Sequence, residues 1–287
     1  MHNINISLTK SSALITSIII SLSILGSVYG HMFSPDESAS FISLIDKIKS
    51  AVASITSTKN LNSSNVKEQT DYATSLLTTK VMKEINERNN RIGTKLSNLI
   101  NDFSNGKYNS TSVNDLNDVL DEAIAVRVEK KQLENTTIHA LAFAMDINEI
   151  LNNYLLAMKS SNNHLTNHKA INNSMEIYNT KDNLTITNMS AFLRAIALTN
   201  ITSERYNTFL KDKSISTNKT NEIEADLVNL LKSINQEVPT ETIMHIVHSE
   251  IQPDLQIAFE LKLAPKDVPM GNMSHNKQST FHGSINT

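Results

Sequence analysis

The chain has 287 residues, a formal net charge of −3, no cysteine and no tryptophan. Without cysteine there are no disulfides, thiolate metal sites or iron–sulfur clusters, and the slightly negative charge offers no basic surface to nucleic acid. Only 6 Gly and 5 Pro interrupt the sequence, whereas sheet proteins need turn residues about every 8 to 12 positions. The composition therefore predicts an all-α protein.

Residues 1–30 have the pattern of a secretory signal peptide. A polar start carrying Lys10 precedes an apolar core from Ala13 to Val28, and Gly30 provides a small residue at the expected cleavage position. This core is shorter than the roughly 20 apolar residues of a membrane span. We predict cleavage after Gly30, with an uncleaved signal anchor as the alternative. In both cases the rest of the chain is expected outside the cytoplasm, with membrane contact only if the signal is uncleaved.

Potential glycosylation sites are frequent after the signal. Asn-x-Ser/Thr sequons fit a secreted, glycosylated surface. They begin at Asn62, Asn109, Asn135, Asn172, Asn183, Asn188, Asn200, Asn218 and Asn272.

Helical periodicity begins after Ser34-Pro35, where Ser34 is the expected N-cap and Pro35 the first helical residue. A first helix is predicted from about residue 35 to residue 57. Apolar residues at helical spacing then predict a second helix of about 40 residues, nearly 60 Å long at 1.5 Å per residue, ending near Asn105-Gly106. We expect this helix either to span a long bundle or to break near Gly93.

The remaining elements complete a helical bundle. Ser112 and Thr240 are expected N-caps, residues 160–188 form a polar loop, and residues 264–287 form a disordered tail. Short connections make neighbouring helices antiparallel. We therefore predict one antiparallel bundle domain of about six to seven helices, residues 31–263, whose two halves share one core. Its later helices are predicted over residues 112–128, 131–158, 189–210, 220–234 and 240–263.

The last predicted helix contains a candidate metal site. On a helical wheel Glu241, His245 and His248 fall within about 60° of one another, so one stripe offers a carboxylate and two imidazoles to a metal ion. The same wheel places this stripe opposite the apolar residues Ile243 and Val247. The alternative interpretation is therefore a solvated face with His248 at its border.

The predicted helix over residues 131–158 offers His139, Asp146 and Glu149 on its polar side. His139 follows the sequon at Asn135, so it is expected near an accessible helix start. Di-iron bundles need inward-facing Glu-x-x-His pairs, and the sequence has none. Hydrolase and phosphate-binding motifs are missing as well. We therefore predict that the protein is not an enzyme, and the less favoured alternative is an enzyme whose site is assembled across helices.

The expected mature N-terminus is a second candidate metal site. After cleavage at Gly30, His31 would offer its α-amine and imidazole to Cu(II). A further imidazole would come from one of four residues: His139, His248, His275 or His282. The alternative is that His31 is only the first residue after the signal.

Three segments carry a resemblance. The sequences HMFSPDESASF, LDEAIAVRVEKKQLENTTIHALAFAMDINEILNNY and IMHIVHSEIQPDLQIAFELKL resemble parts of uncharacterised secreted helical proteins of ammonia-oxidising archaea. The resemblance implies a location and a fold, and no established activity.

Together these observations predict an extracytoplasmic, non-catalytic binding protein, with copper as the first candidate ligand. The alternative is an interaction module of the cell envelope that holds no metal. The expected partner is thus a metal ion or another envelope protein.

Overall fold

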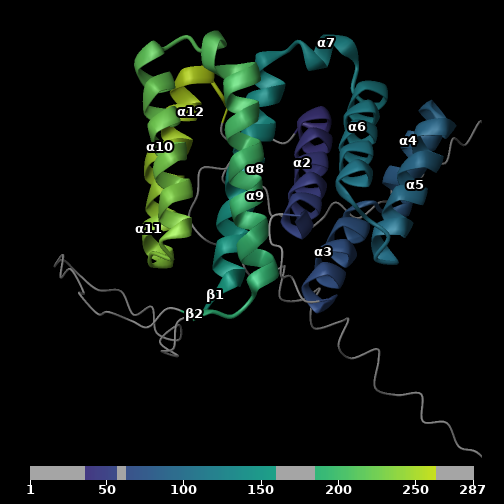
Figure 1. Ribbon diagram of the computed structural model, residues 1–287. Coiled ribbons are helices and arrows are strands. Elements are labelled where there is room, and N and C mark those ends of the chain that lie inside the picture. Colours follow the sequence, from purple (N-terminus) through teal and green to yellow (C-terminus); the bar gives the residue numbers. More distant parts are fainter. Residues whose placement is uncertain (1–35, 57–62, 160–184, 263–287) are drawn as a thin grey trace, which may run out of the picture. The chain divides into compact units, whose positions relative to one another are not determined.

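A computed structural model describes residues 36–56, 63–159 and 185–262 (Figure 1). These residues are helical apart from one short pair of strands and the connections, which confirms the prediction of an all-α bundle. No helix in this part of the chain combines the length and the apolar character needed to cross a membrane. The predicted signal, His31 and the predicted tail lie outside the described residues.

Helix α2 (Glu37–Thr56) lies at the centre of the bundle. Asp36 caps its first turn, because the Ala39 N–H donates to Asp36 Oδ1 at 2.9 Å. The helix packs against α3, α6, α8 and α9. Its apolar residues are consequently buried on more than one side.

The single long second helix is the wrong alternative, because three helices occupy this region. They are α3 (Ser63–Leu76), α4 (Thr79–Arg88) and α5 (Asn90–Ser104). Asn89 separates α4 from α5, and its side chain accepts hydrogen bonds from the first turn of α5. The break thus falls one turn before Gly93, where a Cβ would lie only 1.9 Å from the Asn86 side chain. Glycine at position 93 therefore lets α4 and α5 approach closely.

Asparagine side chains start the next helices. Asn109 caps α6 (Ser110–Arg127), and Ser112, the expected N-cap, instead completes a capping box at the third helical position. After the short α7 (Lys130–Leu133), Asn135 caps α8 (Thr136–Ala157). Strand β1 (Met158–Lys159) then pairs antiparallel with β2 (Thr185–Ile186). This pairing places α8 beside α9 (Met189–Arg205) in the opposite direction.

Two π-helical turns interrupt the second half of the chain. Helix α9 continues into η2 (Tyr206–Leu210) and the 3₁₀ turn η3 (Lys211–Lys213), and α10 (Thr217–Asn235) follows. The last helical stretch consists of α11 (Thr240–His245), η4 (Ile246–Ile251) and α12 (Gln252–Phe259). Thr240 is the first residue of α11 and Pro239 its N-cap, so the expected cap at Thr240 is wrong. Each π turn adds residues to a turn of helix and shifts the faces that follow it.

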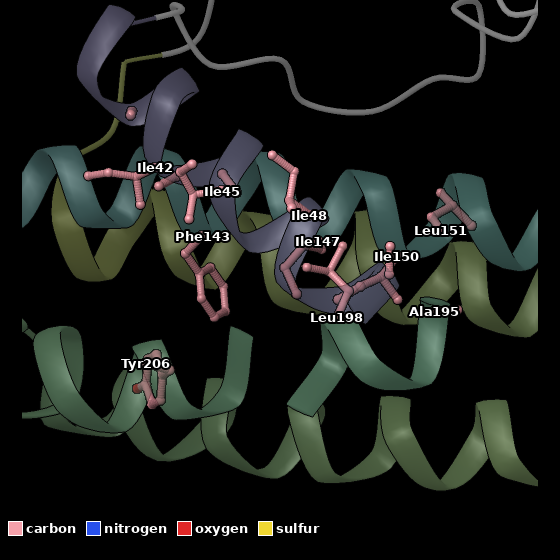
Figure 2. Packing of buried hydrophobic residues seen from close by; sticks show 14 of the residues in the cluster. Ile42, Ile45, Ile48, Phe143, Ile147, Ile150, Leu151, Ala195, Leu198 and Tyr206 are labelled. Carbon is pink, nitrogen blue, oxygen red and sulfur yellow. The ribbon is translucent and has the colours of Figure 1, made fainter. Parts of the chain in front are cut away.

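The hydrophobic core lies where α2, α8 and α9 meet (Figure 2). Figure 2 shows Ile45 from α2 and Phe143 from α8 in this region, with Leu198 from α9 close to the α8 residues. Helices α10 and α12 extend the same cluster, and its members are more than nine-tenths buried. Both halves of the chain therefore contribute to one continuous core.

Candidate functional site

The predicted metal stripe is not assembled in the structure. Glu241 and His245 are exposed, and His245 Nε2 lies 3.5 Å from Glu250 Oε1. His248 is half-buried, and its Nδ1 lies 3.0 Å from Gln252 Oε1. The wheel assumed a regular α-helix, but η4 begins directly after His245 and changes the direction of His248. Within the described residues, no three His, Asp or Glu side chains form a group able to hold a metal ion.

His139 lies in the core and not on a polar surface, so its predicted accessibility is wrong. Only 4% of His139 is exposed, its Nε2 is 2.7 Å from the Leu133 carbonyl oxygen, and its ring stacks on Phe209 at 4.3 Å. Helix α8 packs against α2 and α9, and the π turn η2 carries Phe209 over the imidazole. His31 lies outside the described residues, so its copper chelate stays a prediction.

His139 belongs to a buried group of polar and charged side chains that we call the Arg205 cluster: Ser43, Asp46, His139, Asp146 and Arg205. Arg205 Nε donates to Asp46 Oδ2 at 2.7 Å, and Arg205 Nη2 donates to the same oxygen. Arg205 Nε lies 4.0 Å from Asp146 Oδ2. Ser43 Oγ donates to Asp146 Oδ1 at 2.6 Å. The cluster thus links α2, α8 and α9 through two carboxyl groups and one guanidinium.

One proton balances the charges of this cluster. Burial, followed by the negative charge of Asp46, raises the pKa of Asp146 well above its ordinary value. Asp146 Oδ2 is buried and has no hydrogen-bond partner among the described residues. A proton on Asp146 removes one of the two negative charges and makes this side chain a donor towards Asp46. Arg205 and ionised Asp46 then neutralise each other.

His139 remains neutral in this environment. Burial lowers the pKa of His139, and the Arg205 charge lowers it further. Donation by Nε2–H to Leu133 leaves Nδ1 without a proton, 3.4 Å from Arg205 Nη1. The imidazole therefore accepts from the cation and adds no second positive charge.

A second buried guanidinium forms what we call the Arg194 cluster: Gln69, Tyr72, Glu149, Asn153 and Arg194. Arg194 Nε donates to Asn153 Oδ1 and Nη1 donates to Gln69 Oε1, each at 3.0 Å. The guanidinium lies over the Tyr72 ring, 4.2 Å from its centroid. Tyr72 donates to Glu149 Oε1 at 3.0 Å. Uncharged amide oxygens and an aromatic face thus surround this cation. The Glu149 carboxylate is connected to it through Tyr72.

Glu149 connects the Arg194 cluster to the surface. Lys47 Nζ lies 3.2 Å from Glu149 Oε2, and both side chains are partly exposed. Burial, followed by the Glu149 charge, raises the pKa of Tyr72 above its ordinary value. The phenol therefore keeps its proton and stays a donor to Glu149.

Neither cluster opens onto the groove at the α3–α4 junction. That groove is lined by Leu77, Thr79, Met82, Lys83, Asn86 and Glu87. The hydrogen bonds within each cluster join side chains of α2, α3, α8 and α9. Their chemistry is therefore that of internal ties between helices, with a proton held at Asp146.

Asp46, Arg194 and Arg205 were not predicted from the sequence as site residues. A signal was present for Arg194, which stands within the apolar run of residues 191–198. Asp46 gave no such signal, because Ser43, Lys49 and Ser50 are its neighbours at helical spacing. A charge inside an apolar face needs a buried partner, but one sequence does not identify that partner.

No family model, curated protein or solved structure matches this chain. The resemblance to archaeal proteins therefore stays a prediction.

Proposed function

We propose that the protein is an extracytoplasmic, non-catalytic binding protein of the cell envelope, and that its partner is another envelope protein. The signal-like pattern of residues 1–30 supports the location. The observation that carries the binding role is a pair of exposed isoleucines on neighbouring segments of one end of the bundle.

This pair, Ile215 and Ile257, leaves most of its apolar surface in water. Ile215 is 68% exposed and Ile257 52% exposed. The Ile215 N–H donates to the Ala258 carbonyl oxygen at 3.1 Å, and Ser214 Oγ donates to the same oxygen at 3.3 Å. These two hydrogen bonds hold the segment before α10 against α12, so both isoleucines are presented on a fixed backbone.

An apolar partner surface would gain free energy at this place. Burying an isoleucine side chain contributes about 1.5–3 kcal/mol. A fixed backbone reduces the conformational entropy that binding would otherwise cost. An apolar surface on a second protein therefore fits this pair better than a hydrated ligand does.

Copper binding is the alternative function. It is supported by the His31 N-terminus that cleavage after Gly30 would create, and by the exposed imidazole of His245. A metal chelator distinguishes the two functions, because it removes the metal and leaves an apolar contact unchanged.

Replacement of the two isoleucines tests the proposal. We expect the Ile215→Asp, Ile257→Asp double variant to be lost from the envelope fraction of the cell. Its unfolding in urea should match that of the wild type. Val228→Asp is the matched control, because Val228 is 66% exposed but lies in the middle of α10. Retention of the double variant would refute the proposed surface. Release of the wild-type protein by chelator would favour the metal-dependent alternative.

A further inference from the structure

Two sequon asparagines lie at exposed helix starts. Asn109 and Asn135 are both exposed N-caps. Asn109 Oδ1 accepts from Ser112 N–H at 2.9 Å, and Asn135 Oδ1 accepts from Thr137 N–H at 2.9 Å. In each case the cap uses the amide oxygen and leaves Nδ2 without a protein partner among the described residues. Their sequon hydroxyls, on Thr111 and Thr137, belong to exposed residues.

Three other described sequons, at Asn188, Asn200 and Asn218, have a buried hydroxyl residue. Asn200 is exposed, but Thr202 is fully buried and Asn200 lies inside α9. Asn218 is exposed, while Thr220 is 4% exposed and donates to the Ser216 carbonyl oxygen. These sequons cannot present both residues to an enzyme while their helices are intact.

In the sequon at Asn188, the amide nitrogen is hydrogen-bonded and the hydroxyl residue is buried. Asn188 Nδ2 donates to Glu68 Oε1 at 3.2 Å, and Ser190 is fully buried. A saccharide on this nitrogen would replace that hydrogen bond, and the hydroxyl is out of reach. Asn188 therefore belongs with Asn200 and Asn218.

We infer that Asn109 and Asn135 are glycan acceptors of the folded protein, and that Asn188, Asn200 and Asn218 are not. The donor would be a saccharide activated as a phosphate ester of a membrane lipid. Nδ2 forms a bond to the anomeric carbon, the bond from that carbon to the phosphate oxygen breaks, and the phosphate leaves with the electron pair. The Nδ2 proton passes to a base of the transferase. The inference rests on the proposed location outside the cytoplasm.

Local opening explains the selection. A helix end frays at little cost, whereas exposing a buried hydroxyl inside α9 or at the start of α10 requires loss of core contacts. The bulky product must also remain in water. An N-cap with a free Nδ2 and an exposed sequon hydroxyl satisfies both requirements, since its backbone already lies outside the helix and Oδ1 keeps its capping role after Nδ2 is modified. Asn188 also caps a helix, but its Nδ2 is bonded to Glu68 and Ser190 is buried.

Site-by-site mass spectrometry of the full chain, secreted by cells that glycosylate Asn-x-Ser/Thr outside the cytoplasm, tests the inference. We expect glycan on the peptides with Asn109 and Asn135 and none on the peptide with Asn200. Thr111→Ala and Thr137→Ala should each remove one glycan while leaving the capping asparagine in place. Thr111→Ser and Thr137→Ser keep the sequon and should restore it.

Two results would overturn the inference. One is secreted protein that is unmodified at both Asn109 and Asn135, and this result leaves the proposed location standing. The other is equal modification of Asn200, which would show that transfer precedes folding. If the protein is found in the cytoplasm, the proposed function fails. Transfer to purified folded protein, using a lipid-phosphate saccharide and its transferase, then tests the same two sites separately.

Discussion

The Arg205 and Arg194 clusters each contain a buried guanidinium, but its hydrogen-bond partners differ between the two. Arg205 pairs with Asp46 and has Asp146 close by, so two carboxyl groups surround one guanidinium. Arg194 donates to two amide oxygens and lies on an aromatic ring. Burial raises the pKa of a carboxyl group, whereas an amide does not titrate. Of the two clusters, the Arg205 cluster should therefore make the larger contribution to the pH dependence of the bundle's stability.

The largest expected effect comes from removing both carboxylates of the Arg205 cluster. Asp46→Asn combined with Asp146→Asn leaves Arg205 buried without a counter-charge, which costs about 3–5 kcal/mol. Asp46→Asn alone should cost less, because Asp146 can ionise and replace the lost partner. Urea unfolding at neutral pH measures both values. Equal losses in the single and double variants would contradict the compensation by Asp146.

Removing each guanidinium in turn should separate the two clusters by the pH dependence of the stability that is lost. Arg194→Met leaves two buried amide oxygens without a donor, and each unpaired buried group costs about 1–3 kcal/mol. This loss should change little across the pH range. Arg205→Met leaves two buried acids that must both take up protons. Its cost should therefore grow as pH rises above the ordinary carboxyl pKa of about 3.9. Parallel pH profiles for the two variants would remove the distinction between the clusters.

A partly exposed acid provides a smaller case of the same effect. Burial, followed by the Glu250 charge, raises the pKa of Asp226 to about 6. A raised carboxyl pKa means that the folded state holds the proton more tightly, so stability falls as pH rises towards that value. Asp226→Asn should stabilise the protein at neutral pH by less than about 1 kcal/mol, since solvent screens the site. The gain should disappear in acid, and a gain that persists there would point to a different cause.

The sequence predicts much of the helical architecture because local signals decide it. The apolar stripe of α2 and the interval from residue 189 to residue 210 follow from periodicity. The position of the α4–α5 break was only approximate, because the capping role of Asn89 depends on how the two helices pack. The π turns were missed, since a wheel drawn for a regular helix cannot include an added residue.

The candidate site was less predictable than the fold. His139 and Asp146 were placed on the polar side of a helix, but α8 is covered by α2, α9, η2 and α12 and has little surface left. Whether a polar residue faces water or another helix depends on tertiary packing. The pairing of Asp46 with Arg205 joins residues that are 159 positions apart. No local pattern indicates such a contact.

The pH dependence of unfolding in Asp146→Asn tests whether Asp146 holds a proton in the folded protein. Asn resembles the protonated acid but cannot ionise. Each pH unit between the ordinary and the raised pKa should cost the wild type about 1.4 kcal/mol that the variant does not lose. We therefore expect the variant to be at least as stable as the wild type at neutral pH and to gain on it as pH rises from acid. A variant that is less stable by the same amount at every pH would contradict the claim.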